Sequence, residues 1–237
     1  MQFLHMKLEG SENKITCEPG AMSYMSNDVT ASVNCDAPIK RCCGGQPCIM
    51  SVYEGDKGYI GLSPALPAKV IPIYVGQQGL TRFKSGNYLA HIGNVDLNFD
   101  FDCCSPTCCF GGQGCVRPSV DGTGIAFLQA MGTILEKDLA DGETVVIDTN
   151  GLLAWSGTTT MGIKTVGNCC TCCCGGEGCF NTTITGPGKA YVQSYSKEKF
   201  VQAIQSMVPP PKKKGGAGLA NAVANAGAPV DAAEMER

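Results

Sequence analysis

Cysteine is the residue type that gives this chain its clearest capacity for chemistry. The chain has 16 cysteines, and only Cys17 and Cys35 lie outside three clusters. The clusters are Cys42, Cys43 and Cys48; then Cys103, Cys104, Cys108, Cys109 and Cys115; then Cys169, Cys170, Cys172, Cys173, Cys174 and Cys179. Thiols can pack as small apolar groups, bind zinc or another soft metal, carry acyl chains, or form redox-sensitive disulfides.

These four uses leave different marks in the sequence. Cys43 and Cys48 flank a glycine turn, as a half-site for tetrahedral zinc would require, but the usual C-x₂-C pair does not recur in every cluster. We therefore assign no metal or other cofactor and keep a thiolate-bound metal as an alternative. Adjacent cysteines on exposed loops suit acylation, in which two or more chains anchor a protein firmly. No export signal is visible, so we expect reduced thiols.

The cysteine clusters belong to a repeated pattern. Each contains a glycine pair, two further residues and a cysteine, and the three pairs begin 67 and 64 residues apart. The glycines of these turns are Gly44, Gly45, Gly111, Gly112, Gly175 and Gly176. Upstream, Gly20, Gly86 and Gly151 keep nearly the same step. This spacing predicts one folding unit of about 65 residues used three times, at about 1–77, 78–143 and 144–195.

The elements that position the cysteines are predicted to be β-strands. Residues 70–75, 145–147 and 190–193 are short runs rich in β-branched or aromatic residues, and glycine-containing turns separate such runs. Residues 135–139 and the Asp141-Gly142 pair predict a strand and a hairpin turn. The fold class is therefore all-β, with the three units forming a pseudo-threefold sandwich or prism.

One helix is predicted at about 196–208, after the third unit. Ser196 is a suitable N-cap, and apolar residues recur on one face of the helix before three prolines end it. Residues 209–237 are rich in Pro, Lys, Gly and Ala and are predicted to form a flexible tail. The chain is thus one domain over residues 1–208 followed by that tail.

Several motifs together resemble a known family. They are Glu18-Pro19-Gly20-Ala21-Met22, Gly61-Leu62-Ser63-Pro64-Ala65-Leu66-Pro67, Leu139-Ala140-Asp141-Gly142-Glu143, Gly175-Gly176-Glu177-Gly178 and Thr185-Gly186-Pro187-Gly188. In this order they resemble the mitochondrial biogenesis family named for altered inheritance of mitochondria. The resemblance implies a fold like that of the tryptophan RNA-binding attenuator protein, and no catalytic residues carry over. The cysteine clusters replace loops that are rich in leucine, phenylalanine and glycine in the family.

Charge and composition argue against several functions. The net charge is -3 and no basic stripe is present, so nucleic acid is not an expected partner. No apolar run is long enough to span a membrane. His5 and His91 do not stand beside a nucleophile motif, so we do not expect an enzyme. Because no presequence is visible, we expect a cytoplasmic protein, with peripheral membrane association as a second option, rather than a mitochondrial one.

The function predicted from the sequence is a non-enzymatic scaffold. Its Cys-rich loops would mediate association with a protein partner, a membrane surface or further copies of the chain. The alternative is a thiolate metal-binding or redox-responsive protein that uses the same three clusters.

Overall fold

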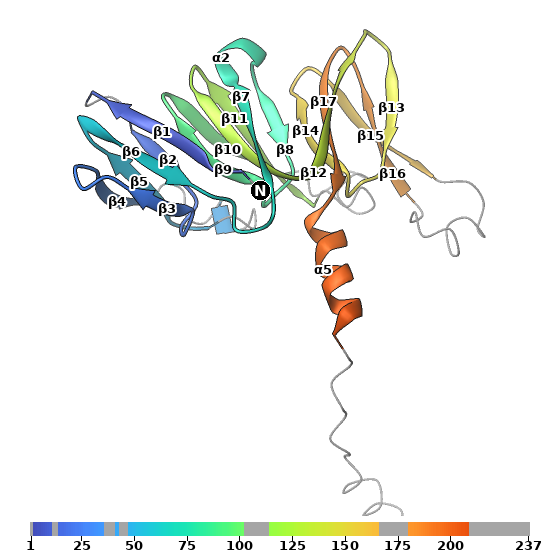
Figure 1. Ribbon diagram of the computed structural model, residues 1–237. Coiled ribbons are helices and arrows are strands. Elements are labelled where there is room, and N and C mark those ends of the chain that lie inside the picture. The colour runs from blue at the N-terminus through green and yellow to red at the C-terminus, as the bar shows by residue number, and fades with distance from the viewer. Residues whose placement is uncertain are drawn as a thin grey trace, which may run out of the picture. The chain divides into compact units, whose positions relative to one another are not determined.

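The computed structural model describes residues 2–10, 14–35, 41–42, 47–101, 114–165 and 180–208. The chain divides into two units, Met1–Phe200 and Val201–Arg237. The first unit is built almost entirely of β-strands, as the sequence predicts (Figure 1). The predicted tail at 209–237 lies outside the described residues.

Short connections join successive strands, except between β4 and β5, between β10 and β11, and between β15 and β16. Those of the first third of the chain are β1 (Leu4–Glu9), β2 (Ile15–Cys17), β3 (Met22–Met25), β4 (Thr30–Asn34), β5 (Met50–Glu54) and β6 (Lys57–Leu62). Next come β7 (Lys69–Tyr74), α2 (Val75–Gln78), β8 (Thr81–Phe83), β9 (Tyr88–Ile92), β10 (Val95–Phe101), β11 (Val116–Gly122) and β12 (Ile125–Leu139). The last are β13 (Thr144–Ile147), β14 (Leu152–Ser156), β15 (Thr160–Thr165), β16 (Phe180–Thr185), β17 (Gly188–Tyr195) and α5 (Lys197–Met207).

The same antiparallel pairings recur in three segments of the chain. In the first segment β1 pairs with β6, β6 with β3, β4 with β5 and β5 with β2. The second segment repeats these pairs as β7–β12, β12–β9, β10–β11 and β11–β8. The third repeats them as β12–β17, β17–β14, β15–β16 and β16–β13. Each set begins with β1, β7 or the second half of β12, one strand earlier than the predicted boundaries at 78 and 144.

Even an irregularity recurs at the same place. The register of β3 on β6 shifts between Met22 and Tyr24, and that of β14 on β17 shifts between Leu152 and Ala154. The register of β9 on β12 shifts at the corresponding position, opposite Phe127 and Leu128. A β-bulge bends and twists its strand, so the three segments share this local geometry as well as their pairing.

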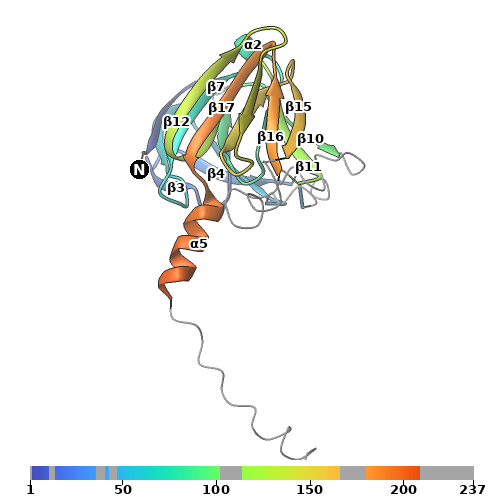
Figure 2. The same ribbon diagram turned by 90° about the vertical axis from the view of Figure 1, so that its right-hand side faces the viewer.

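Four layers of sheet result within the described residues. The outer layers are the three-stranded sheets β1-β6-β3 and β13-β16-β15. Between them lie β7-β12-β9-β2-β5-β4 and β12-β17-β14-β8-β11-β10, which are connected because both contain part of β12. Gly132, with φ of 73°, lies at the register shift where β12 passes from one layer to the other. Figure 1 shows the blue strands of the first segment and the yellow-to-orange strands of the third at opposite ends of this unit, and Figure 2 looks at the end that the third segment forms.

Three clusters of buried apolar side chains in the described residues hold the layers together. One contains Leu8, Ile60, Ile15 and Phe127, and thus joins the β1-β6-β3 layer to its neighbour. The central cluster includes Tyr88, Phe83, Leu128, Leu153 and Tyr191. The third includes Leu152, Trp155, Ile147 and Ile184. Trp155, the largest side chain of this third cluster, is 2% exposed.

One predicted hairpin is wrong. The turn at Asp141-Gly142 forms, with Gly142 at φ of 75° and the Glu143 N–H donating to the Ala140 carbonyl. However, β12 before the turn pairs with β17, whereas β13 after it pairs with β16. The turn therefore carries the chain from one layer to the next, because both strands find longer-range partners.

Candidate functional site

Most of the predicted cysteine site lies outside the described residues. This holds for Cys43, Cys103, Cys104, Cys108, Cys109, Cys169, Cys170, Cys172, Cys173, Cys174 and Cys179, and for the turn glycines Gly44, Gly45, Gly111, Gly112, Gly175 and Gly176. The described cysteines are Cys17, Cys35, Cys42, Cys48 and Cys115. The strands that carry the three clusters are described in full.

Equivalent hairpins carry the three Cys-rich segments. Strands β4 and β5 end at the pair Asn34–Met50, and β10 and β11 end at Phe101–Val116. Strands β15 and β16 end in the same way, at Thr165–Phe180. Each Cys-rich segment therefore connects the same two strands of the recurring pattern. The fold attaches all three to a body that the three apolar clusters hold together.

The described thiols differ in environment. Cys42 and Cys48 lie within hydrogen-bonding reach, and this contact, followed by desolvation and the charge of Cys42, raises the pKa of the Cys48 thiol. Cys115 is disulfide-bonded, whereas Cys17, Cys35, Cys42 and Cys48 are free. The expectation of reduced thiols is therefore wrong at Cys115. Among the described residues, no group of three or more His, Cys, Asp or Glu could hold a metal ion.

Cys17 has a structural role. Its side chain is fully buried in the cluster beneath the β1-β6-β3 layer. Burial, together with the neighbouring charge of Glu18, raises the pKa of the thiol to about 12. The thiolate is the reactive form of cysteine, and a pKa this high keeps the Cys17 thiol protonated at neutral pH. Cys17 therefore packs as an apolar residue.

A second candidate site is formed by three equivalent turns. Glu18 follows β2, Lys84 follows β8 and Asp148 follows β13, each as the first residue after its strand. Lys84 is 7% exposed, which is unusual for a lysine. Such a residue needs partners for its charge, and the first turn of α5 supplies them.

Consecutive residues of α5 meet the three turns with opposite charge. Lys84 Nζ lies 3.1 Å from a carboxylate oxygen of Glu198, and Lys199 Nζ lies 2.7 Å from Asp148 Oδ2. The charge of Lys197 acts on Glu18. Ser196 caps the helix as predicted, because its Oγ accepts the Lys199 backbone N–H at 3.2 Å. The helix therefore begins where the three segments meet.

The pKa values of the two acidic turn residues move in opposite directions. Burial raises the pKa of Glu18 to about 7, although a hydrogen bond from Gln129 and the charge of Lys197 oppose the rise. Burial would also raise the pKa of Asp148, but hydrogen bonds from Lys199 and the Asn150 backbone, with the nearby lysine charges, lower it overall. Whether the pKa rises or falls follows from the number of hydrogen-bond donors around each carboxylate.

Glu18 borders a cavity of about 360 Å³. Its lining consists of Glu18, Pro47, Ala65, Leu66, Ala68, Gly86, Asn87, Gln129, Met131 and Lys197. Gln129 Nε2 lies 3.2 Å from Glu18 Oε2 and 3.0 Å from the Tyr88 carbonyl, so the amide is held in place. The cavity thus combines an apolar wall with a few polar groups, namely the Glu18 carboxyl group, the Lys197 ammonium and two side-chain amides.

The histidines have structural surroundings. His91 Nδ1 lies 2.6 Å from the Tyr88 hydroxyl, which also donates to the Thr16 carbonyl at 3.2 Å. Burial, assisted by the charge of Arg41, lowers the pKa of His91 to about 4, so the ring is neutral. His5 Nδ1 contacts the Tyr24 hydroxyl at 2.8 Å on the surface.

Sequence reasoning missed the charged turns. Glu18 belongs to one of the motifs that carry the family resemblance, whereas Lys84 and Asp148 belong to none of them. A signal was available, because these residues stand 66 and 64 positions apart, in step with the glycine landmarks. What the spacing could not supply was the opposite charge in α5, which lies outside the repeat.

Comparison with known proteins supports the resemblance. The family model described as mitochondrial biogenesis AIM24 matches residues 1–195. An uncharacterized protein of Streptococcus pyogenes serotype M6 is 28% identical over 160 residues, which is 67% of this chain. The chain spans 62% of the length of that curated relative.

The fold also has a counterpart among solved structures. The crystal structure of a Streptococcus pyogenes protein matches with a TM-score of 0.69 and 21% identity, covering 87% of this chain and 94% of that one. At this identity the match shows the fold alone. In the described residues of this chain, no helix has both the length and the apolar character needed to cross a membrane.

Proposed function

Because the chain belongs to the mitochondrial biogenesis AIM24 family, we propose that it is a non-enzymatic scaffold whose Cys-rich segments associate with a partner protein or a membrane surface. The observation that carries this proposal is the recurrence of one hairpin, as β4–β5, β10–β11 and β15–β16. A single body therefore carries three Cys-rich segments, each attached to an equivalent hairpin.

Three attachment points on one body favour multivalent binding. Once the first segment binds, the others are held near the same surface, and their effective concentration there is high. The same reasoning applies to acyl chains, since one chain binds a membrane marginally and two or more bind it firmly.

The experiment replaces the cysteines of the second and third clusters with serine in the full chain. We expect the wild-type protein to divide between a soluble fraction and a membrane- or partner-bound fraction, and the variant to lose the bound fraction. Hydroxylamine, which cleaves thioesters, identifies acylation if it releases the wild type. Cys35→Ser, an exposed change outside the clusters, is the matched control. Identical distributions of all three proteins would contradict the proposal.

Redox response is the second candidate function, and it is favoured by the disulfide at Cys115 and the contact between Cys42 and Cys48. Two thiols would lose two electrons and two protons to oxidised glutathione, giving one disulfide and two reduced glutathiones. We expect the free-thiol content to change reversibly with the glutathione ratio. A thiol content that stays constant across that range would eliminate this candidate, and elemental analysis of the purified protein would detect a thiolate-bound metal instead.

A further inference from the structure

Strands β3 and β13 each have a free edge at a position where the equivalent strands of the other segments are paired. In the described part of the chain, β3 pairs with β6 alone and β13 pairs with β16 alone. Their counterparts in the other segments are paired on both edges. Strand β2 lies against β9, and β8 lies against β14, so each outer segment contributes half of a six-stranded layer.

The recurring registers say how the free edges would fit. Cys17 stands opposite Ala90, and Phe83 stands opposite Ala154. The residue that corresponds to Ala90 and Ala154 in β3 is Tyr24, and the residue that corresponds to Cys17 and Phe83 in β13 is Ile147. An antiparallel pair of the same kind would place Ile147 opposite Tyr24 and Val146 opposite Met25.

Burial shows what the free edge of β3 lacks. In β9 and β14 the residues Ala90 and Ala154 are completely buried. In β3, by contrast, Met22, Tyr24 and Met25 are 37%, 41% and 39% exposed. Neither β3 nor β13 carries a charged residue or a proline, the usual protections of an edge strand.

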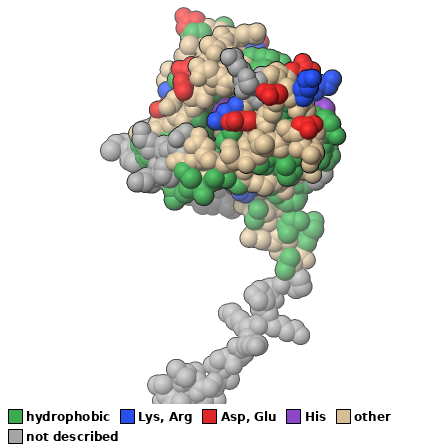
Figure 3. Space-filling view, turned by 90° about the vertical axis from the view of Figure 1, so that its left-hand side faces the viewer, with side chains coloured by type: hydrophobic (Ala, Val, Ile, Leu, Met, Phe, Trp, Pro, Cys, Tyr) green, Lys and Arg blue, Asp and Glu red, His purple; other side chains and the backbone are tan. Residues whose placement is uncertain are grey.

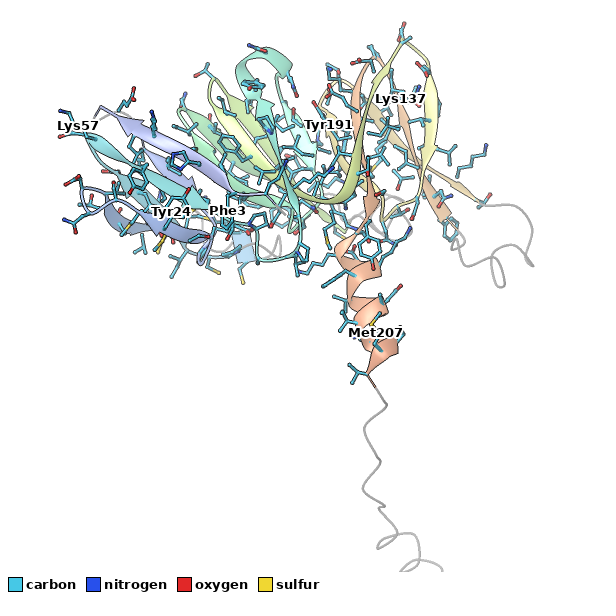
Figure 4. All side chains as sticks on the ribbon, in the orientation of Figure 1. Phe3, Tyr24, Lys57, Lys137, Tyr191 and Met207 are labelled. Carbon is cyan, nitrogen blue, oxygen red and sulfur yellow. The ribbon has the colours of Figure 1, made fainter. Side chains whose placement is uncertain are left out.

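The outer face of the β1-β6-β3 layer shows the same deficit. Phe3, Tyr24 and Tyr59 are exposed there, and Tyr24 packs at 6.5 Å from Phe3 and 6.2 Å from Tyr59 between ring centroids. Figure 4 shows Phe3 and Tyr24 low on the strands of the first segment. The Tyr24 ring lies over Gly61, and the residue that corresponds to Gly61 in the third segment is the buried Tyr191. Hydrophobic side chains gather low on this face in the space-filling view (Figure 3).

We infer that β13 of one copy of this chain pairs with β3 of a second copy and completes a six-stranded layer. The occupant is a second copy because the chain already uses this strand pair twice, as β2–β9 and β8–β14. Figure 1 places β3 and β13 at opposite ends of the unit, so one chain offers each edge to a different neighbour. The contact joins unlike surfaces, and such contacts produce rings or open chains of copies.

The test uses two variants that each block one edge. Val146→Lys places a charge on β13 and Met25→Lys places one on β3. These side chains are 45% and 39% exposed, so we expect both variants to fold. In either variant alone every contact contains one blocked strand, and we expect at least a tenfold weaker association by light scattering than for the wild type. Mixed in equal amounts, the two variants should form complexes of two chains and no larger, through the unblocked β3 of one and the unblocked β13 of the other.

Controls and contrary outcomes are defined by the same geometry. Val33→Lys adds the same charge to the edge strand β4, at a side chain 71% exposed, and should associate like the wild type. A wild type that keeps the mass of one chain at all concentrations would overturn the inference. The inference would also be overturned if the mixture of the two variants fails to form complexes, or if the Val33→Lys control associates as weakly as they do. A third contrary result is hydrogen-exchange protection of the β3 and β13 amides by each other within a single chain.

Discussion

Replacing Glu18 with glutamine should stabilise this protein at neutral and alkaline pH. Glutamine has nearly the same shape and can still accept the hydrogen bond that Gln129 Nε2 donates at 3.2 Å. It removes the charge that burial disfavours. The pKa of Glu18 is raised from 4.5 to about 7, so the folded state holds its proton more tightly than the unfolded state does.

The direction and size of the effect follow from this shift. Below pH 4.5 both states are protonated and Glu18 costs nothing. As the pH rises from 4.5 to 7 the unfolded state releases its proton first, so the free energy of unfolding falls. At about 1.4 kcal/mol per pKa unit, the loss is at most roughly 3.5 kcal/mol. Because the carboxyl group borders an open cavity, we expect about 2 kcal/mol, or about 4–8 °C in Tm for a chain of this size.

The assay is urea unfolding at several pH values between 5 and 8. The variant should be more stable than the wild type at pH 8, and the difference should shrink toward pH 5. Asp148→Asn is the matched control at the equivalent turn. The pKa of Asp148 is lowered in the folded state, so this change should destabilise by a nearly constant amount over the same range. If Glu18→Gln destabilises at pH 8, or its effect does not vary with pH, the burial argument is wrong.

Three further outcomes test the packing. Cys17 should stay unmodified by iodoacetamide in the native protein, because the Cys17 thiol is buried and its pKa is about 12. Mass spectrometry should detect an adduct on the exposed Cys42 under the same conditions. Phe83→Ala, in the central cluster, should lower the free energy of unfolding by about 3–5 kcal/mol, whereas Val33→Ala on the surface should change it by less than about 0.5 kcal/mol in urea titrations. Lys84→Met should raise the pKa of Glu198 in an NMR titration, because the Lys84 ammonium 3.1 Å away helps to lower it; an unchanged pKa would contradict that ion pair.

Local chemistry predicted the elements of this fold well. Alternating and β-branched runs form β7, β13 and β17 where the sequence predicts them, and Ser196 caps α5. Each of these outcomes depends on a residue and its near neighbours in the chain, and for that reason sequence alone could supply them.

Strand partnership could not be predicted in the same way. The Asp141-Gly142 turn was expected to join a hairpin, but β13 instead pairs with β16, about 40 residues further along. A turn sequence fixes the backbone direction of a few residues, whereas the partner of a strand depends on which distant strand buries more apolar surface. The 15-residue strand β12, which serves two layers, illustrates the same limit.

The sequence by itself determined that the chain is β-rich, that its landmarks return every 64 to 67 residues, and that its cysteines follow that period. Only the tertiary structure decided that Glu18, Lys84 and Asp148 meet the first turn of α5, and that β3 and β13 each keep one edge unpaired among the described strands. The physical reason is that charge pairing and sheet closure depend on distances between residues far apart in the chain, which a one-dimensional spacing does not contain.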